Sequence, residues 1–182
     1  MVLLESSDLG VLTEMPLFTL SDSFSQSHSL SDLSKKNGVI LLFTCNHCPY
    51  ALAIWDRFIR FYQTALQLDI GMVAINPNIH PDYPEDGVDQ MRLKVDEWKI
   101  PFPYLVDEDQ SDSQLYSAQC TPDLYYLNSD FKLVYHGRFD DDWQNEAAVQ
   151  SFDLLSACEF YIDSKSILSP QISSMGCSIK WL

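Results

Sequence analysis

Short apolar runs alternate with longer helical patterns along the whole chain, and no segment repeats. Runs rich in β-branched and aromatic residues predict strands. The predicted strands are 16–20, 39–44, 72–75, 102–106, 124–127 and 132–135. Apolar positions at helical spacing predict helices. The predicted helices are 30–33, 50–68, 88–99, 112–118 and 147–162. The strand, helix and strand over 39–75 predict a parallel, right-handed β-α-β unit.

The last two predicted strands are joined by Asn128-Ser129-Asp130-Phe131, which predicts an antiparallel hairpin. Polar residues 21–29 predict a turn region, and residues 76–86, with three prolines, predict a long surface loop. A chain of 182 residues has the length of one domain. We expect a single domain over 1–182, with an N-terminal extension at 1–15 and a C-terminal tail of low regularity at 164–182.

The amino-acid composition limits the kinds of partner that this chain is expected to bind. The chain is 46% apolar and 13% aromatic, which excludes a disordered protein. With 11 basic and 26 acidic residues the net charge is −15, which argues against nucleic acid or an anionic membrane as partner. Residues 1–4 are apolar but lack a basic n-region and a sufficient h-region. Five cysteines do not make a disulfide framework, and we expect a cytoplasmic protein without a cofactor.

Cys45-Asn46-His47-Cys48 lies between the predicted strand 39–44 and the helix 50–68, with Pro49 suited to the first helical turn. A CxxC pair at a strand-to-helix junction is typical of a thioredoxin-type redox site. The unpaired N–H groups and positive macrodipole end of a helix stabilise a thiolate, whose pKa falls from about 8.5. We expect Cys45 to attack, and Cys48, more shielded, to resolve the mixed disulfide.

The two residues between the cysteines tune this chemistry. Protonated His47 places a second cation near the sulfur, and Asn46 is polar. Whatever favours the reduced thiolate makes the disulfide a stronger oxidant. We therefore expect a more oxidising couple than an apolar pair would give.

The order of elements, with Thr121-Pro122 just before the hairpin, resembles the thioredoxin-like superfamily, and more closely its redoxin (AhpC/TSA-type) proteins. The matching motifs are Pro16–Leu20, Phe43–Tyr50, Ala74–Asn76, Tyr83–Asp86, Phe102–Asp107, Thr121–Asp123, Gly137–Asp141 and Gly176–Trp181. The resemblance implies a three-layer α/β fold, with a central mixed sheet flanked by helices, an N-terminal strand extension and a C-terminal tail.

The same resemblance assigns roles near the CxxC pair. It implies that Pro122 is cis and faces the cysteines, and that Thr121 contacts a bound partner. The implied partners are protein or small-molecule thiols and disulfides, together with an unidentified reductant or oxidant. The implied activity is thiol–disulfide exchange by Cys45 and Cys48.

A peroxiredoxin-like thiol peroxidase is one alternative. Peroxiredoxins carry a proline seven residues and a Thr or Ser three residues before the reactive cysteine. Counting back gives Gly38 and Leu42 from Cys45, and Leu41 and Cys45 from Cys48. Neither cysteine has the required pair, so disulfide exchange fits the residues better.

A metal-binding thioredoxin-like protein is a second alternative. Cys45, His47 and Cys48, joined by His80 or Cys120, offer donors for zinc or a cuprous ion. No second CxxC or H-x₃₋₅-H supplies the other half of a structural zinc site, and no metal is expected. A redox-silent interaction module is a third alternative.

Cysteines outside the motif have two interpretations each. Cys120, next to Thr121, is either a thiol that traps or relays an intermediate or a small buried hydrophobe. Cys177 is either an additional resolving thiol or part of a tail that packs through Ile179 and Trp181. Cys158 is expected in the core of the last helix.

Arg138 with Asp140 and Asp141 forms either a charged cluster near the active face or a loop ion pair of small energy.

Overall fold

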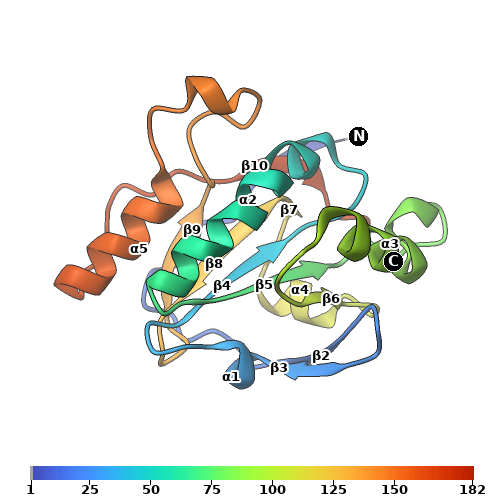
Figure 1. The fold of residues 1–182 in the computed structure, drawn as a ribbon, viewed down its shortest axis with the longest axis horizontal. Coiled ribbons are helices and arrows are strands. Elements are labelled where there is room, and N and C mark those ends of the chain that lie inside the picture. Colours follow the sequence, from blue (N-terminus) through green and yellow to red (C-terminus); the bar gives the residue numbers. More distant parts are fainter. Residues whose placement is uncertain (1) are drawn as a thin grey trace.

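The computed structural model describes residues 2–182, and its main feature is a seven-stranded mixed sheet with helices on both faces (Figure 1). The strand order is β3-β2-β6-β5-β4-β8-β9. The strands are β2 (Thr19–Asp22), β3 (Ser27–Ser29), β4 (Val39–Phe43), β5 (Gly71–Asn76), β6 (Tyr104–Val106), β8 (Asp123–Leu127) and β9 (Leu133–Gly137). The helices are α1 (Leu30–Leu33), α2 (Pro49–Gln67), α3 (Val88–Trp98), α4 (Ser111–Leu115) and α5 (Asp153–Ser164), with 3-10 turns η1 (Pro84–Asp86) and η2 (Glu146–Ala148). This is the expected thioredoxin-like α/β fold.

The central strand β4 shows why the sheet has two cores. All five of its residues are buried, and successive side chains point to opposite faces. Ile40 and Leu42 join a core under α2, α3 and α5, whereas Val39, Leu41 and Phe43 join a core with α1 and the segment after α4. Figure 1 shows the two groups of helices on opposite sides of the sheet. The continuous apolar run is what a strand covered on both faces requires.

The predicted β-α-β unit and the predicted hairpin are both confirmed. Strand β4 pairs in parallel with β5, and α2 connects them. Strands β8 and β9 pair antiparallel. Because β4 also pairs with β8, the start of α2 lies next to the segment that precedes β8. The junction between β4 and α2 and the segment that precedes β8 together form the candidate site.

Most predicted elements differ from the structure by one to three residues at an end, and two of them differ in a way that has a visible cause. The predicted strand 16–20 is instead β2, which begins at Thr19, since Pro16 has no N–H for a ladder. The predicted helix 147–162 is divided into η2 and α5. Between them the chain bonds to Asp141, whose carboxylate accepts from Gln150 N at 2.9 Å and whose N–H donates to Ser151 O at 3.1 Å. That pairing keeps the chain out of the helix.

The tail and the polar turn region also contain structure that was not predicted. Residues 21–29 include a β2–β3 hairpin. Strand β10 (Met175–Ser178) lies between β1 (Leu3–Glu5) and β7 (Cys120–Thr121) in a second sheet of order β1-β10-β7. Ile179 is buried as expected, but Trp181 is 40% exposed and does not join the core. The chain therefore brings both of its end regions to the segment before β8.

Residues 76–86 are not a simple surface loop. Asn76, Asn78 and Asp86 have no exposed surface, and Pro84–Asp86 form η1. Asn76 Nδ2 donates to Asp86 O at 2.8 Å, which holds the end of the loop against the end of β5. No helix in the described part of the chain combines the length and apolarity that spanning a membrane requires.

Candidate active site

The CxxC segment connects the end of β4 to the start of α2. Pro49 is the first residue of α2, and Cys48 is its N-cap, with extended backbone at φ −69° and ψ 121°. Leu52 N donates to Cys48 O at 2.9 Å, which closes the first turn. The positive end of the helix therefore lies at Cys48, whereas Cys45 is three residues before it.

Both sulfurs of the pair are buried. Cys45 and Cys48 have no exposed surface, so the expected greater shielding of Cys48 is not found. Cys45 Sγ lies 3.3 Å from Thr121 Oγ1. Cys48 Sγ lies 3.0 Å from Thr121 O and 2.7 Å from Cys177 Sγ. Cys48 is thus the sulfur that contacts a second sulfur across the fold.

The two thiols differ in acidity, and the order is the reverse of the expected one. Burial, the hydrogen bond with Cys48 and the charge of Asp86 raise the pKa of Cys45 well above its usual value. Hydrogen bonds from Cys45, Cys177 and the Ala51 N–H lower the pKa of Cys48 to about 5, against the opposing effect of burial.

One contact of Cys48 works against ionisation. The Thr121 carbonyl accepts a hydrogen bond from the protonated Cys48 thiol only, so it favours the neutral form. The three donors that stabilise the Cys48 thiolate have a larger effect on its pKa than the one carbonyl that stabilises its neutral thiol. The pKa of Cys45 is therefore shifted in the opposite direction to the expected lowering, because burial, Cys48 and the charge of Asp86 all favour its neutral thiol.

His47 pairs with a buried carboxylate. Its Nδ1 contacts Asp86 Oδ2, and its ring stacks on Tyr83 with centroids 5.2 Å apart. The His47 side chain is 13% exposed and that of Asp86 is fully buried. The hydrogen bond with Asp86 raises the pKa of His47. His47 is therefore not the isolated cation expected from the sequence, because Asp86 balances its charge.

Asp86 also fixes the loop that carries Asn46. Asn46 N donates to Asp86 Oδ1 at 2.6 Å, and Asn46 Nδ2 donates to Glu85 O at 3.0 Å. Tyr104 OH donates to Asn46 Oδ1 at 3.1 Å. Sequence reasoning missed Asp86 because an acidic residue in a proline-rich loop has no local signal of burial. Asn46 acts here as a structural anchor of the loop.

The Thr121-Pro122 peptide bond is cis, as the resemblance implied. Thr121 is fully buried, and its side-chain and main-chain oxygens contact Cys45 and Cys48 respectively. Thr121 also pairs with Cys177 in the antiparallel β7–β10 ladder. The backbone that was expected to receive a partner therefore already lies beside a strand of the same chain.

The other two cysteines are core residues. Cys120 is fully buried and its Sγ lies 3.5 Å from Pro122 O, while burial raises its pKa. Cys158 is fully buried in α5, and burial raises its pKa too. Neither has the stabilised thiolate that a reactive cysteine needs.

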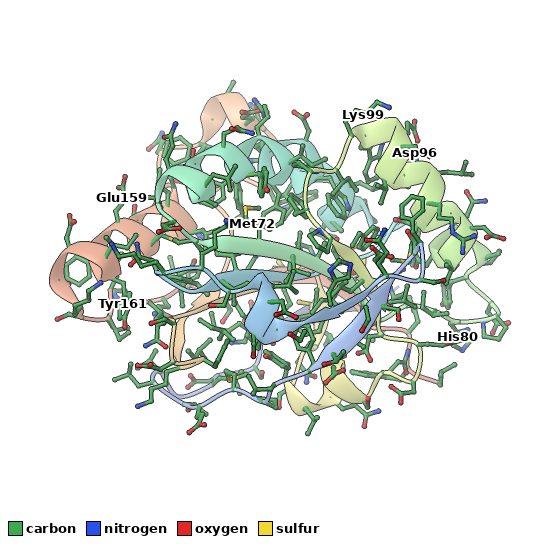
Figure 2. All side chains as sticks on the ribbon, turned by 60° about the horizontal axis from the view of Figure 1, so that its bottom comes forward. Met72, His80, Asp96, Lys99, Glu159 and Tyr161 are labelled. Carbon is green, nitrogen blue, oxygen red and sulfur yellow. The ribbon has the colours of Figure 1, made fainter. Side chains whose placement is uncertain are left out.

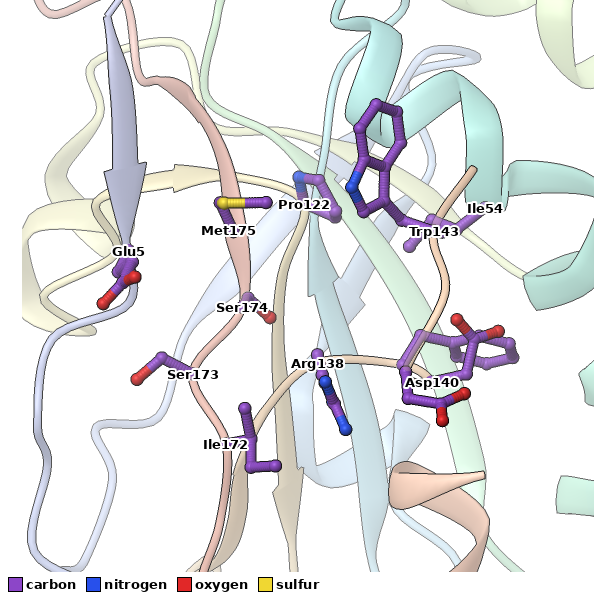
Figure 3. Close-up of a pocket in the computed structure, with 12 residues that line it drawn as sticks. Glu5, Ile54, Pro122, Arg138, Asp140, Trp143, Ile172, Ser173, Ser174 and Met175 are labelled. Carbon is purple, nitrogen blue, oxygen red and sulfur yellow. The ribbon is translucent and has the colours of Figure 1, made fainter. Parts of the chain in front are cut away.

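A cavity of about 350 Å³ opens beside Pro122 (Figure 3). Its apolar part includes Ile54, Trp143 and Met175, and Figure 3 shows them around Pro122. The Trp143 ring packs on Tyr50 in the first turn of α2, with centroids 4.2 Å apart. The cavity thus adjoins the start of the helix that Cys48 caps.

A buried arginine holds one wall of this cavity. Arg57 contacts the Asp140 carboxylate, and it donates to Asp142 O at 3.0 Å and Trp143 O at 2.8 Å. Sequence reasoning missed Arg57, since a single basic residue in an amphipathic helix is usually exposed. The predicted cluster of Arg138 with Asp140 and Asp141 does not form.

Arg138 instead contacts Asp153 at the start of α5. Asp141 accepts from the loop that precedes that helix. Arg138, Asp140 and Asp141 nevertheless all line the cavity, so they lie near the active face without pairing with one another.

Donor atoms of Cys45, His47 and Asp86 lie within 4.8 Å of one another, which is close enough to hold a metal ion. Asp86 is absent from the predicted donor set. His80 is not part of this group; Figure 2 shows it at the edge of the molecule, and its Nδ1 accepts from Asp82 N at 3.1 Å.

Comparisons with known proteins agree on the fold. The model of the AhpC/TSA family matches residues 11–136. An uncharacterized conserved protein from Geobacillus kaustophilus has a TM-score of 0.94 at 32% identity, covering 100% of this chain and 97% of its own. No curated protein sequence matches significantly.

More distant solved structures share the fold. Peroxidoxin BcpB from Mycobacterium tuberculosis has a TM-score of 0.66 at 14% identity, over 87% of this chain and 100% of its own. A secreted Mycobacterium tuberculosis disulfide oxidoreductase homologous to E. coli DsbE has a TM-score of 0.58 at 18% identity, over 78% of this chain and 92% of its own.

Proposed function

The chain belongs to the AhpC/TSA family, and on that premise we propose that it is a thiol–disulfide oxidoreductase with Cys45 and Cys48 as its redox pair. The observation that carries the proposal is the position of Cys48. Its sulfur lies at the N-cap of α2, takes hydrogen bonds that lower its pKa to about 5, and lies against the cis Thr121-Pro122 segment. A stabilised thiolate beside a second thiol is the minimum requirement for disulfide exchange.

In the proposed reaction Cys48, not Cys45, is the attacking sulfur. The Cys48 thiolate attacks one sulfur of a partner disulfide, forming a mixed disulfide and releasing the first partner thiolate. Cys45, held beside Thr121 Oγ1, then attacks the Cys48 sulfur and releases the second partner thiolate. The Cys45–Cys48 disulfide is returned to the dithiol by a reducing dithiol, and the reverse sequence oxidises a partner.

The lowered pKa of Cys48 bears on the direction of exchange. A lower pKa stabilises the reduced form and makes the disulfide more oxidising. Since neither sulfur is exposed, small or extended disulfides fit the site better than a disulfide on a flat protein surface. The cavity beside Pro122 offers room for the groups attached to such a disulfide.

The test is redox equilibration of the whole protein with reduced and oxidised glutathione. We expect a two-electron transition in which the thiols of Cys45 and Cys48 are oxidised together to one disulfide. The Cys48→Ser variant should not show this transition. Cys158→Ala is the matched control, because Cys158 is equally buried but lies in α5. A wild-type protein that forms no intramolecular disulfide under any ratio of the two glutathione forms would refute the proposal.

Metal binding is the second candidate, favoured by the clustered donors of Cys45, His47 and Asp86. The direct His47–Asp86 hydrogen bond must break before either residue can bind an ion with the same atoms. Metal analysis of protein purified without chelator separates the two functions. One equivalent of zinc or copper, lost in both Cys45→Ser and Asp86→Asn, would support the metal function instead.

A further inference from the structure

Cys177 places a further sulfur against the proposed nucleophile. Cys48 Sγ and Cys177 Sγ are 2.7 Å apart, although 129 positions separate them in the chain. Both are buried, with Cys48 at 0% and Cys177 at 1% exposure. Together with Cys45 and Ala51 they form a separate cluster of buried residues. The site therefore contains three sulfurs and not two.

The contact depends on a close approach of two strands. Strand β10 pairs with β7 in a register that sets Cys177 opposite Thr121. A Cβ at Gly176 would lie 2.1 Å from Thr121 O, so only glycine allows the strands this spacing. Thr121 O is also the oxygen that Cys48 contacts at 3.0 Å. One carbonyl thus marks where β7, β10 and the start of α2 meet.

Strand β10 is held on its other side as well. It pairs with β1 over Leu3, Leu4 and Glu5, and Ser178 N donates to Val2 O at 2.9 Å. After the strand, Lys180 N donates to Asn78 Oδ1 at 3.0 Å. These contacts place Cys177 by main-chain pairing on both edges, so its position does not depend on a mobile tail.

We propose that Cys177 is a third redox sulfur of this protein, which competes with Cys45 to resolve the mixed disulfide at Cys48 and gives a second oxidised form with a Cys48–Cys177 disulfide. The inference rests on the proposed function, because it needs Cys48 to react with a disulfide. It adds a second resolving sulfur, which comes from β10, at the strand position beside Thr121. The covalent bond would join the first turn of α2 to the C-terminal strand.

The chemistry balances with a low-molecular-weight disulfide, RSSR, as the oxidant. The Cys48 thiolate attacks RSSR, forming Cys48–S–SR and releasing one RS⁻. The Cys177 sulfur then attacks Cys48 Sγ, the Cys48–SR bond breaks, and the second RS⁻ leaves with the proton that Cys177 gives up. Two protein thiols lose two electrons, and RSSR becomes two RSH.

Hydrogen bonding suits Cys177 to the second step and not the first. Its thiol donates to the Cys48 thiolate, so burial and this contact raise the pKa of Cys177 to about 12 while Lys180 opposes the rise. When Cys48 is in a mixed disulfide its negative charge is gone, so the contribution of Cys48 to the raised pKa of Cys177 is removed while the effect of burial stays. Cys177 becomes easier to deprotonate at the step where it must attack.

Trypsin separates the possible disulfides cleanly. Cys45 and Cys48 lie on the peptide 37–57, and Cys177 lies on the peptide 166–180. The full-length protein is oxidised with oxidised glutathione, alkylated, digested without reductant and analysed by mass spectrometry. We expect the 37–57 and 166–180 peptides to be cross-linked in wild type and in Cys45→Ser, but not in Cys177→Ser.

The outcomes distinguish the two proposals. If Cys45→Ser instead accumulates glutathione on peptide 37–57, and wild type shows only an internal disulfide in that peptide, Cys177 is not a redox sulfur and the oxidoreductase function stands. If neither wild type nor Cys177→Ser forms a disulfide involving Cys48, the proposed function itself fails. Cys158→Ala, whose cysteine lies in α5, should behave as wild type throughout.

Discussion

His47 and Asp86 form an ion pair in which the histidine is partly exposed and the carboxylate is fully buried. The pair joins the CxxC loop to the end of the 76–86 segment, because Asp86 also accepts from Asn46 N. A buried carboxylate needs such partners, since an unpaired charge in the interior is costly. The protonation state of His47 is therefore coupled to the position of the CxxC loop.

Replacement of Asp86 by Asn should lower the pKa of His47, because the hydrogen bond with Asp86 is the largest cause of its rise. A raised pKa in the folded state contributes stability that is fully present below the unfolded value of about 6.5 and is lost as pH rises through the folded value. Asp86→Asn should therefore cost about 1.5–3 kcal/mol at pH 5 and less at high pH. Urea unfolding across this pH range, with NMR titration of His47, measures both effects. An equal loss of stability at all pH values would contradict the linkage.

Alkylation of Cys48 should follow its lowered pKa. Only the thiolate reacts, so the rate should rise with pH to a plateau with a midpoint near pH 5. Cys45 should react only at much higher pH, because burial raises its pKa. Iodoacetamide labelling of the wild-type protein, with fragment-ion mass spectrometry of peptide 37–57 to locate the label on Cys45 or Cys48, separates the two thiols. A faster reaction at Cys45 near neutral pH would restore the assignment made from the sequence.

Gly176→Ala tests the strand contact behind the third sulfur. The added methyl group meets Thr121 O, so β10 must move away from β7, at a cost of about 1–3 kcal/mol. We expect both lower stability and less cross-linking between peptides 37–57 and 166–180. Gly10→Ala is the matched control, because its Cβ would meet only Thr13 Oγ1 at 3.4 Å. Equal stability and equal cross-linking in the two variants would show that the Cys48–Cys177 contact does not depend on the close approach of β10 to β7.

Arg57→Met removes the buried support of the cavity wall. It leaves the Asp140 carboxylate and two loop carbonyls without their donor, so we expect a loss of about 3–5 kcal/mol in the free energy of unfolding. Arg60→Met, one turn further along α2, breaks only exposed pairs with Asp56 and Glu146 and should cost much less. Thermal or urea unfolding compares them directly. Similar losses in both would mean that the Arg57 contacts are not special.

The elements that were predicted correctly are those with a strong local pattern. The all-apolar run of β4, the long amphipathic α2 and the β8–β9 hairpin each carry their own signal. Strand β10 has no such signal, since Met-Gly-Cys-Ser is a poor strand sequence on its own. It is a strand because β1 and β7 lie on either side of it, which no local pattern reveals.

The residues of the candidate site divide in the same way, into those with a local sequence signal and those without one. The CxxC motif is recognised from its spacing and setting and the cis proline from the family resemblance, but Asp86 and Arg57 belong to the site through long-range contacts. The N-cap position of Cys48 is different, because its signal is present in the sequence. Pro49 at the first helical position makes Cys48 the N-cap. The lowered pKa of Cys48 has no such local signal, because it depends first on the hydrogen bond from Cys45 and then on the one from Cys177.

The second sheet also bears on where this protein can be trimmed. The family match ends at residue 136 and starts at residue 11, so it leaves out both β1 and β10. A fragment cut at those limits would keep the CxxC pair but would lack the sulfur beside Cys48. It would also expose the edge of β7, and an unpaired strand edge promotes aggregation. Any truncated version used in assays should therefore retain residues 2 to 180.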